Sequence, residues 1–110
     1  MPTLSRDRLS VLGFDWDEGN LAKCAKHGVS QDAIEGLFKR PVAILPDVAH
    51  SAREERFRAI GRTVDGRAIF LVFTLRRGHA GLFIRPISAR YMHRREIESY
   101  EKENPNLSER

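Results

Sequence analysis

The segment 68–75, Ala-Ile-Phe-Leu-Val-Phe-Thr-Leu, restricts the possible folds more than any other part of the chain. Apolar residues fill both alternating sets of positions, a pattern typical of a strand that is covered on both faces. The run has the length of a strand and is far too short to span a bilayer as a helix. Turn signals border it, with Asp65-Gly66 before it and residues 77–81 after it. The chain is therefore predicted to build a sheet around this central strand.

The segments on either side of this strand predict its neighbours. Residues 56–63 alternate, so that Phe57 and Ala59 share one face while three arginines share the other. Residues 82–88 predict a third strand, in which Pro86 requires an edge position or a bulge because proline donates no backbone hydrogen bond. We expect these three strands to form an antiparallel meander.

Helices are predicted before and after the meander. Apolar spacing and capping residues indicate helices over 17–26 and 30–40 before it and over 92–102 after it. Short strands are expected at 13–17 and 42–45. This order predicts an α+β fold in which two N-terminal helices pack on an antiparallel sheet and a C-terminal helix follows the meander. We expect the helices on one face of the sheet and the three arginines on the other, open face.

A single domain is expected over 13–103, with an N-terminal extension at 1–12 and a polar C-terminal tail at 104–110. The apolar fraction of 41% and the charged fraction of 31% are typical of a folded, soluble domain. The polar N-terminus, which contains Asp7, does not resemble a secretory signal. The single cysteine, Cys24, cannot form an internal disulfide, so a cytoplasmic protein without a membrane span is expected.

Positive charge is concentrated in the second half of the chain. The net charge is +4, and residues 66–95 contain no carboxylate. The planar guanidinium of arginine is suited to paired hydrogen bonds with phosphate oxygens. This stretch therefore favours a polyanion such as RNA as a partner. Its arginines are Arg67, Arg76, Arg77, Arg85, Arg90, Arg94 and Arg95.

Several short motifs occur in a fixed order along the chain, and the ordered set is more specific than any single motif. They are Phe14-Asp15-Trp16-Asp17, Lys26-His27-Gly28-Val29-Ser30, His50-Ser51 with Glu54-Glu55-Arg56-Phe57, Ile60-Gly61, Gly66-Arg67 and Ile87-Ser88-Ala89-Arg90. With these motifs the chain resembles the BrnT family, the toxins of a type II toxin–antitoxin system, over about residues 13–102.

The resemblance implies a RelE-like fold and a ribonuclease activity that inhibits translation. It also implies neutralisation by a BrnA-type antitoxin with a ribbon-helix-helix DNA-binding domain. Dimerisation of the toxin within a 2:2 toxin–antitoxin complex is implied as well. A second hypothesis stays open, in which the same fold is a non-catalytic module that binds RNA or only a protein. Titratable residues beside the arginines favour the enzyme.

A ribonuclease that uses no metal must stabilise the negative charge of the phosphorane, and arginines aimed at the phosphate do this. Arg90 and Arg58 are the catalytic candidates for this task, although Arg58 on an alternating strand also fits a solvent-facing position. Arg90 is expected between a strand and a helix, where it could instead be a structural link. The expected RNA-binding residues are Arg56, Arg62, Arg76, Arg77, Arg85 and Arg94.

The reaction must also activate the ribose 2′-hydroxyl and protonate the leaving 5′-oxygen. Glu55 is a candidate general base, although alternation points it toward the face of Phe57, where it could fix an arginine. His93 is a candidate general acid or a surface residue. Lys26 and His27 are further catalytic candidates through their motif, and both also fit a cap at the end of a helix.

No metal and no cofactor are expected. Cys24 and His27 form only half of a zinc-binding spacing, and the other histidines supply no second pair. No P-loop or dinucleotide-binding glycine pattern occurs. Cys24 falls on an apolar stripe with Leu21 and Ala25, so it is expected in the core.

Overall fold

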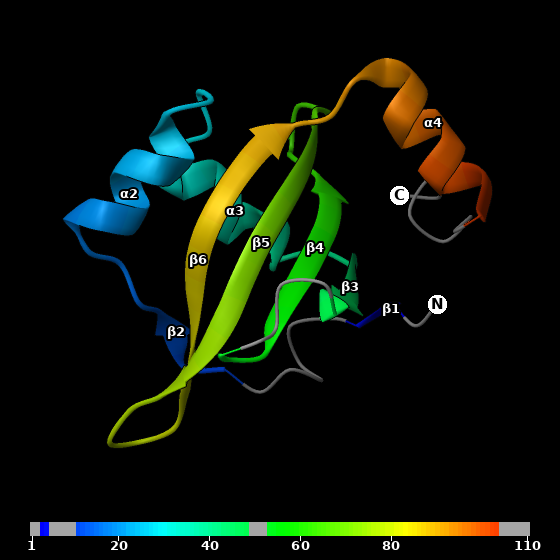
Figure 1. Cartoon of the computed structure of the whole chain (residues 1–110). Helices are drawn as coiled ribbons and strands as arrows, with labels where there is room; N and C mark the ends of the chain where they lie inside the picture. Colours follow the sequence, from blue (N-terminus) through cyan, green and yellow to red (C-terminus); the bar gives the residue numbers. More distant parts are fainter. Residues whose placement is uncertain (1–2, 5–10, 49–52, 104–110) are drawn as a thin grey trace.

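The computed structural model describes residues 3–4, 11–48 and 53–103, which form three helices and six strands (Figure 1). The expected tail at 104–110, most of the expected extension at 1–12, and the motif residues His50 and Ser51 lie outside the described residues. No helix in the described ranges is long and apolar enough to cross a membrane. In chain order the elements are β1 (Thr3–Leu4), β2 (Gly13–Phe14), α2 (Glu18–Ala25), α3 (Gln31–Leu37), β3 (Val42–Pro46), β4 (Arg56–Arg62), β5 (Ala68–Arg77), β6 (Leu82–Tyr91) and α4 (Arg94–Glu103).

The strands form one mixed sheet in the order β1-β3-β4-β5-β6-β2. β4, β5 and β6 are consecutive antiparallel neighbours, with β5 between the other two. β2 pairs with β6 in parallel, through hydrogen bonds from Leu12 N–H to Leu82 O and from Asp15 N–H to Ile84 O, each 2.8 Å long. The prediction of a purely antiparallel sheet is therefore wrong. A two-residue strand carries no sequence signal that identifies so distant a partner.

Capping residues begin both N-terminal helices at the predicted positions. The Asp17 carboxylate accepts the Asn20 backbone N–H at 2.9 Å, while the Asn20 side-chain oxygen accepts the Asp17 N–H at 2.7 Å. The Ser30 hydroxyl accepts the Ala33 N–H at 3.1 Å and caps α3. These side chains satisfy N–H groups that have no acceptor within their own helix. Gly28, in the turn after α2, has the positive φ of 81° that favours glycine.

The main core lies between the sheet and the segment that contains α2 and α3. Leu37 of α3 and the following Phe38 share this core with Leu71 and Phe73 of β5, and all four are almost completely buried. Phe38 meets Phe73 edge-on with 5.7 Å between ring centroids, a favourable aromatic geometry. The meander therefore has one face closed by the N-terminal half of the chain.

α4 packs on the other face of the sheet. Its Ile97 is buried in a second cluster with Ile60 of β4, whose neighbour Ala59 belongs to the main core. Successive residues of a strand point to opposite faces, so the two clusters lie on opposite sides of the sheet. The prediction that all helices cover one face is therefore wrong. α4 is held by ion pairs such as Arg62–Glu101, with 2.7 Å from Nε to Oε2, and a local pattern cannot indicate such pairs.

β6 is longer than predicted and ends at Tyr91 rather than at residue 88. Its pairing with β5 shifts between Val72 and Phe73, where Phe73 faces Pro86. Of the two alternatives predicted for Pro86, an edge position or a bulge, the structure therefore shows the bulge. Arg90 consequently lies inside the strand, opposite Phe70, and not between a strand and a helix. The extra residue of the bulge lets β6 continue its pairing along β5, which the sequence pattern did not indicate.

Cys24 lies in the main core at 1% exposure, as its place on the apolar stripe predicts. Burial raises the pKa of its thiol to about 11, so the side chain is neutral and poorly reactive at neutral pH. Cys24→Ala should lower the free energy of unfolding by about 1 kcal/mol, as a small core truncation does, and leave function intact. Thermal melts and an activity assay of the variant check this. A variant that melts normally but is inactive would identify a functional thiol instead.

Candidate functional site

Six arginines belong to the sheet face on which α4 packs, and we call this the arginine face. Arg56 of β4, Thr74 of β5 and Arg85 of β6 are direct antiparallel partners, so their side chains lie on the same face in one row. Two residues further along β4, Arg58 lies opposite Val72 in the next row. By the same register the arginines of this face are Arg56, Arg58, Arg62, Arg76, Arg85 and Arg90.

A cavity of about 730 Å³ opens at the end of the arginine face that α4 does not cover. Arg56, Arg76 and Arg85, which come from three different strands, line one side of it, and the N-terminal turn of α2 lines the other. Lys23 of α2 and Glu54, which precedes β4, also line the cavity. We call this cavity the arginine groove. It contains three of the residues predicted to bind RNA.

Carboxylates hold two of the groove arginines in place. Arg85 donates to the Asp17 carboxylate at 2.7 Å and lies 3.4 Å from the Asp15 carboxylate. The Asn20 backbone N–H and then the Arg85 guanidinium hold the pKa of Asp17 below its ordinary value. Arg76 lies 3.3 Å from the Glu54 carboxylate. The groove is therefore cationic, with acidic side chains that orient its guanidinium groups.

Asn20 joins the two walls of the groove, and the sequence analysis did not select it. Its side-chain amide is buried and donates to Pro86 O of β6 and to Asp15 O, both at 2.9 Å. One side chain thus caps α2 and fastens the helix to the bulge of β6. The only sequence signal is its position three residues after Asp17, where a capping box places a polar side chain.

Arg58 differs from the other arginines of this face in its contacts. Within the described part of the chain it makes no ion pair, and its Nε–H is buried without a hydrogen-bond acceptor. Burial raises the pKa of Tyr100 in α4, and the positive charge of Arg58 opposes this rise. The Arg58 side chain therefore lies near α4. A buried donor without a partner costs free energy, and this distinguishes Arg58 from the arginines of this face that pair with a carboxylate.

Arg90 makes a bidentate ion pair with Glu96 of α4. The distances are 2.9 Å from Nη1 to Oε1 and 2.8 Å from Nη2 to Oε2, and the guanidinium lies 4.8 Å from the centroid of Phe70. The Arg90 guanidinium holds the pKa of Glu96 below its ordinary value, so this stabilisation exists at neutral pH and is lost on acidification. Glu96 also accepts the His93 backbone N–H at 3.2 Å. Arg90 therefore links β6 to the start of α4.

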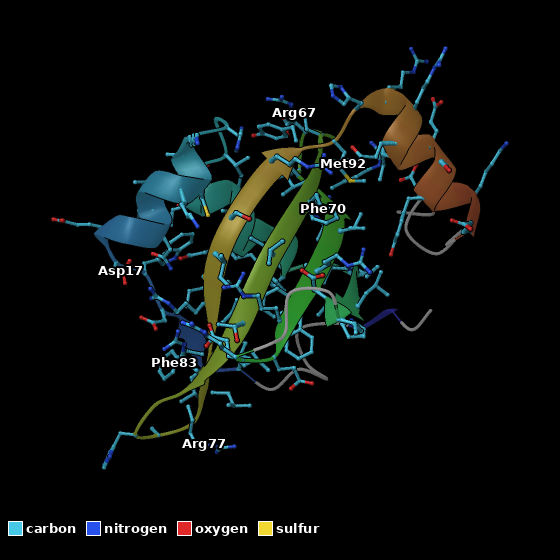
Figure 2. All side chains as sticks on the ribbon, viewed as in Figure 1. Asp17, Arg67, Phe70, Arg77, Phe83 and Met92 are labelled. Atoms are coloured by element: carbon cyan, nitrogen blue, oxygen red, sulfur yellow. The ribbon has the colours of Figure 1, made fainter. Side chains whose placement is uncertain are left out.

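The remaining arginines predicted to bind RNA have different surroundings. Arg62 makes a bidentate pair with Glu101 of α4, at 2.7 and 2.8 Å. Arg94 pairs with Glu98 one turn along α4, at 3.2 Å. Arg77 is exposed at the end of β5, where the β5–β6 hairpin projects from the sheet (Figures 1 and 2). None of these three lines the arginine groove.

The titratable residues predicted to be catalytic lie outside the groove lining. Glu55 is exposed just before β4, and its backbone carbonyl accepts the Thr74 hydroxyl at 2.6 Å. Lys26 and His27 are exposed at the C-terminal end of α2. His93 is exposed just before α4. The carboxylates that line the groove are instead those of Asp17, Glu18 and Glu54, and Glu54 is the residue next to the predicted Glu55.

The groove has the composition of an anion-binding site. Arginine donors match phosphate oxygens in pairs, and a carboxylate next to them can accept a proton. The fold and the site define a small, basic α+β protein with an arginine-lined groove.

The chain belongs to the BrnT family, described as the ribonuclease toxin of a type II toxin–antitoxin system, whose sequence model matches residues 16–96. This match confirms the family that the motifs indicate and implies an antitoxin partner. No curated protein and no solved structure matches the chain.

Proposed function

We propose that this protein is a toxin that cleaves RNA in the arginine groove without a metal ion. The observation that supports this most directly is the convergence of Arg56, Arg76 and Arg85 with Glu54 in one cavity. Arg58 lies about 7 Å further along β4, which is two residues of a strand. The arginines supply the positive charge that a metal ion supplies in other nucleases.

The proposed reaction is transfer of the phosphate within the RNA strand. The ribose 2′-oxygen attacks phosphorus while Glu54 accepts the proton of the 2′-hydroxyl. The bond from phosphorus to the 5′-oxygen then breaks, and this leaving oxygen takes a proton from solvent water. Arg56 and Arg85 bind the phosphate, and Arg58 stabilises the additional negative charge of the phosphorane. The products are a 2′,3′-cyclic phosphate and a free 5′-hydroxyl.

The proposal gives Arg90 a positioning role, because its guanidinium lies outside the groove lining and its pair with Glu96 joins β6 to α4. Arg62 likewise holds α4 to the sheet through its ion pair with Glu101. Arg94 is part of α4 and pairs with Glu98 of the same helix. Lys26, His27, Glu55 and His93 have no role at the reacting phosphate in this proposal, because they are exposed outside the strands and belong neither to the groove nor to the arginine face.

The biological setting of the proposal follows from the family. RNA cleavage would inhibit translation in the cytoplasm, and a BrnA-type antitoxin with a ribbon-helix-helix domain would neutralise the toxin. The proposed assembly is a toxin homodimer in a 2:2 toxin–antitoxin complex. The family description supports the ribonuclease and the toxin–antitoxin system, and an antitoxin follows from the latter.

Purified protein, freed of antitoxin, should cleave RNA in EDTA as fast as in magnesium. End-group analysis should find 2′,3′-cyclic phosphates. Glu54→Gln should lower the rate at saturating RNA by about a hundredfold, within the usual range for a general base, and Glu55→Gln should leave it nearly unchanged. Activity that requires magnesium would contradict the metal-independent reaction. RNA binding without cleavage under all conditions would identify the non-catalytic binding module instead.

A further inference from the structure

Arg67 and Tyr91 form a stacked pair at the end of the sheet where β5 begins. The guanidinium carbon of Arg67 lies 3.5 Å from the centroid of the Tyr91 ring. Arg67 is exposed and makes no ion pair within the described part of the chain. Its neighbours Arg62 and Arg94, by contrast, each pair with a glutamate of α4. The stack therefore orients the Arg67 guanidinium, while the nearby Asp65 acts on it only through charge attraction.

The pair borders a cavity of about 310 Å³. Met92 and Ile97 add apolar surface to this cavity, and the ion pair of Arg94 with Glu98 also lines it. Figure 2 shows Arg67 and Met92 near the start of α4, at the opposite end of the sheet from Phe83 and Arg77. The volume is at the lower end of the range for ligand pockets, about 300–1,000 Å³, so it suits a group of the size of one nucleoside.

We propose that the Arg67–Tyr91 pair is a stacking site for one nucleobase of the RNA, an inference that rests on the proposed function. A guanidinium is planar and weakly hydrated, and one of its faces already lies on an aromatic ring. Its other face offers a flat, cationic surface of the kind on which unpaired RNA bases stack. Met92 and Ile97 would contact the edge of the base, and Arg94 would contact a neighbouring phosphate.

The position of the pair predicts a dependence on RNA length. Tyr91 and Arg85 lie six residues apart on β6, which corresponds to roughly 20 Å of strand. A strand of RNA bound in the arginine groove must therefore extend by several nucleotides before a base reaches Arg67. Short RNA should occupy the groove alone, and longer RNA should occupy both places.

Fluorescence anisotropy with 2′-O-methyl oligoadenylates, which lack the 2′-hydroxyl needed for cleavage, measures binding separately from catalysis. Arg67→Ala should weaken binding of a 12-mer about tenfold, within the usual range for one stacked base, and leave a 4-mer unaffected. Tyr91→Leu should have the same effect, and Arg67→Lys should not restore binding because the flat face is lost. Arg95→Ala, which removes an exposed arginine outside the cavity, is the matched control, and thermal melts verify that all variants fold.

A 12-mer built entirely of abasic nucleotides separates stacking from charge attraction. Wild type should bind it more weakly than the oligoadenylate, and this preference should shrink in Arg67→Ala. Equal losses for both oligomers in Arg67→Ala, or full rescue by Arg67→Lys, would show a phosphate contact and overturn the inference. Adenosine monophosphate tests the site by itself. If the wild-type protein binds no RNA, the proposed function fails. Binding of adenosine monophosphate that Arg67→Ala abolishes would still support a nucleobase site. If the wild-type protein binds neither RNA nor adenosine monophosphate, the nucleobase site is overturned as well.

Discussion

Arg58→Ala should lower the rate of RNA cleavage at saturating RNA by about a hundredfold or more, because it removes a charge that acts mainly in the transition state. The affinity for RNA should change little, since Arg56, Arg76 and Arg85 still line the groove. The melting temperature should also change little, because Arg58 makes no ion pair in the described part of the chain. Single-turnover rates, RNA affinity and a thermal melt of the same variant test all three expectations.

Arg58→Lys tests the geometry, because it keeps the charge but loses the planar fork, and it should restore little activity. Arg90→Ala and Glu96→Gln form the matched controls, since they break the same ion pair from its two sides. If Arg90 positions α4, the two variants should lose similar stability and retain similar activity. Normal cleavage by a folded Arg58→Ala protein would contradict the role proposed for Arg58. Loss of cleavage in Arg90→Ala but not in Glu96→Gln would assign the reacting cation to Arg90.

Asn20→Ala should have the largest effect on stability, a loss of about 3 kcal/mol, because it leaves buried acceptors without donors. The variant loses both hydrogen bonds from the side-chain amide, to Pro86 O and Asp15 O, and the acceptor for the Asp17 N–H. Such a loss corresponds to a melting temperature lower by roughly 10–20 °C for a domain of this size.

Two variants separate the contributions of Asn20. Ser30→Ala removes only a helix cap and should cost about 1 kcal/mol. Asn20→Asp keeps the acceptor of the cap but places a negative charge against two carbonyl oxygens, which raises the pKa of the new carboxyl in the folded state. That variant should gain stability as the pH falls through the raised pKa. An Asn20→Ala protein no less stable than Ser30→Ala would show that the bonds to β6 contribute nothing.

The fold was predictable where neighbouring residues determine it. The apolar run of 68–75 identifies the central strand, Asp17 and Ser30 identify two helix starts, and Pro86 identifies the bulge. The partner of β2 and the position of α4 were not predictable. They depend on contacts such as Arg62–Glu101, between residues 39 positions apart, which leave no periodic pattern in the sequence.

The sequence predicted the kind of chemistry at the candidate site better than it predicted which residues form the site. An arginine-rich stretch without carboxylates indicates a polyanion partner, and Arg56, Arg76 and Arg85 do line one groove. The sequence cannot show which arginines pair with a carboxylate. Arg90 pairs with Glu96, whereas Arg58 makes no ion pair in the described part of the chain. Likewise, alternation cannot show which of two adjacent glutamates reaches the groove, because both precede the first residue of β4.

Because β6 lies late in the chain, the groove can form only after most of the protein has been synthesised. The walls of the groove join through Asn20 and Pro86, which are 66 residues apart, and through Asp17 and Arg85, which are 68 apart. Contacts of such separation form late in folding, because a long loop must close first. While the ribosome is still adding residues, at about 5–20 per second, the emerging N-terminal segment lacks the strand that completes its site. The nascent polypeptide therefore has no assembled groove before β6 has been added and has paired with the rest of the sheet.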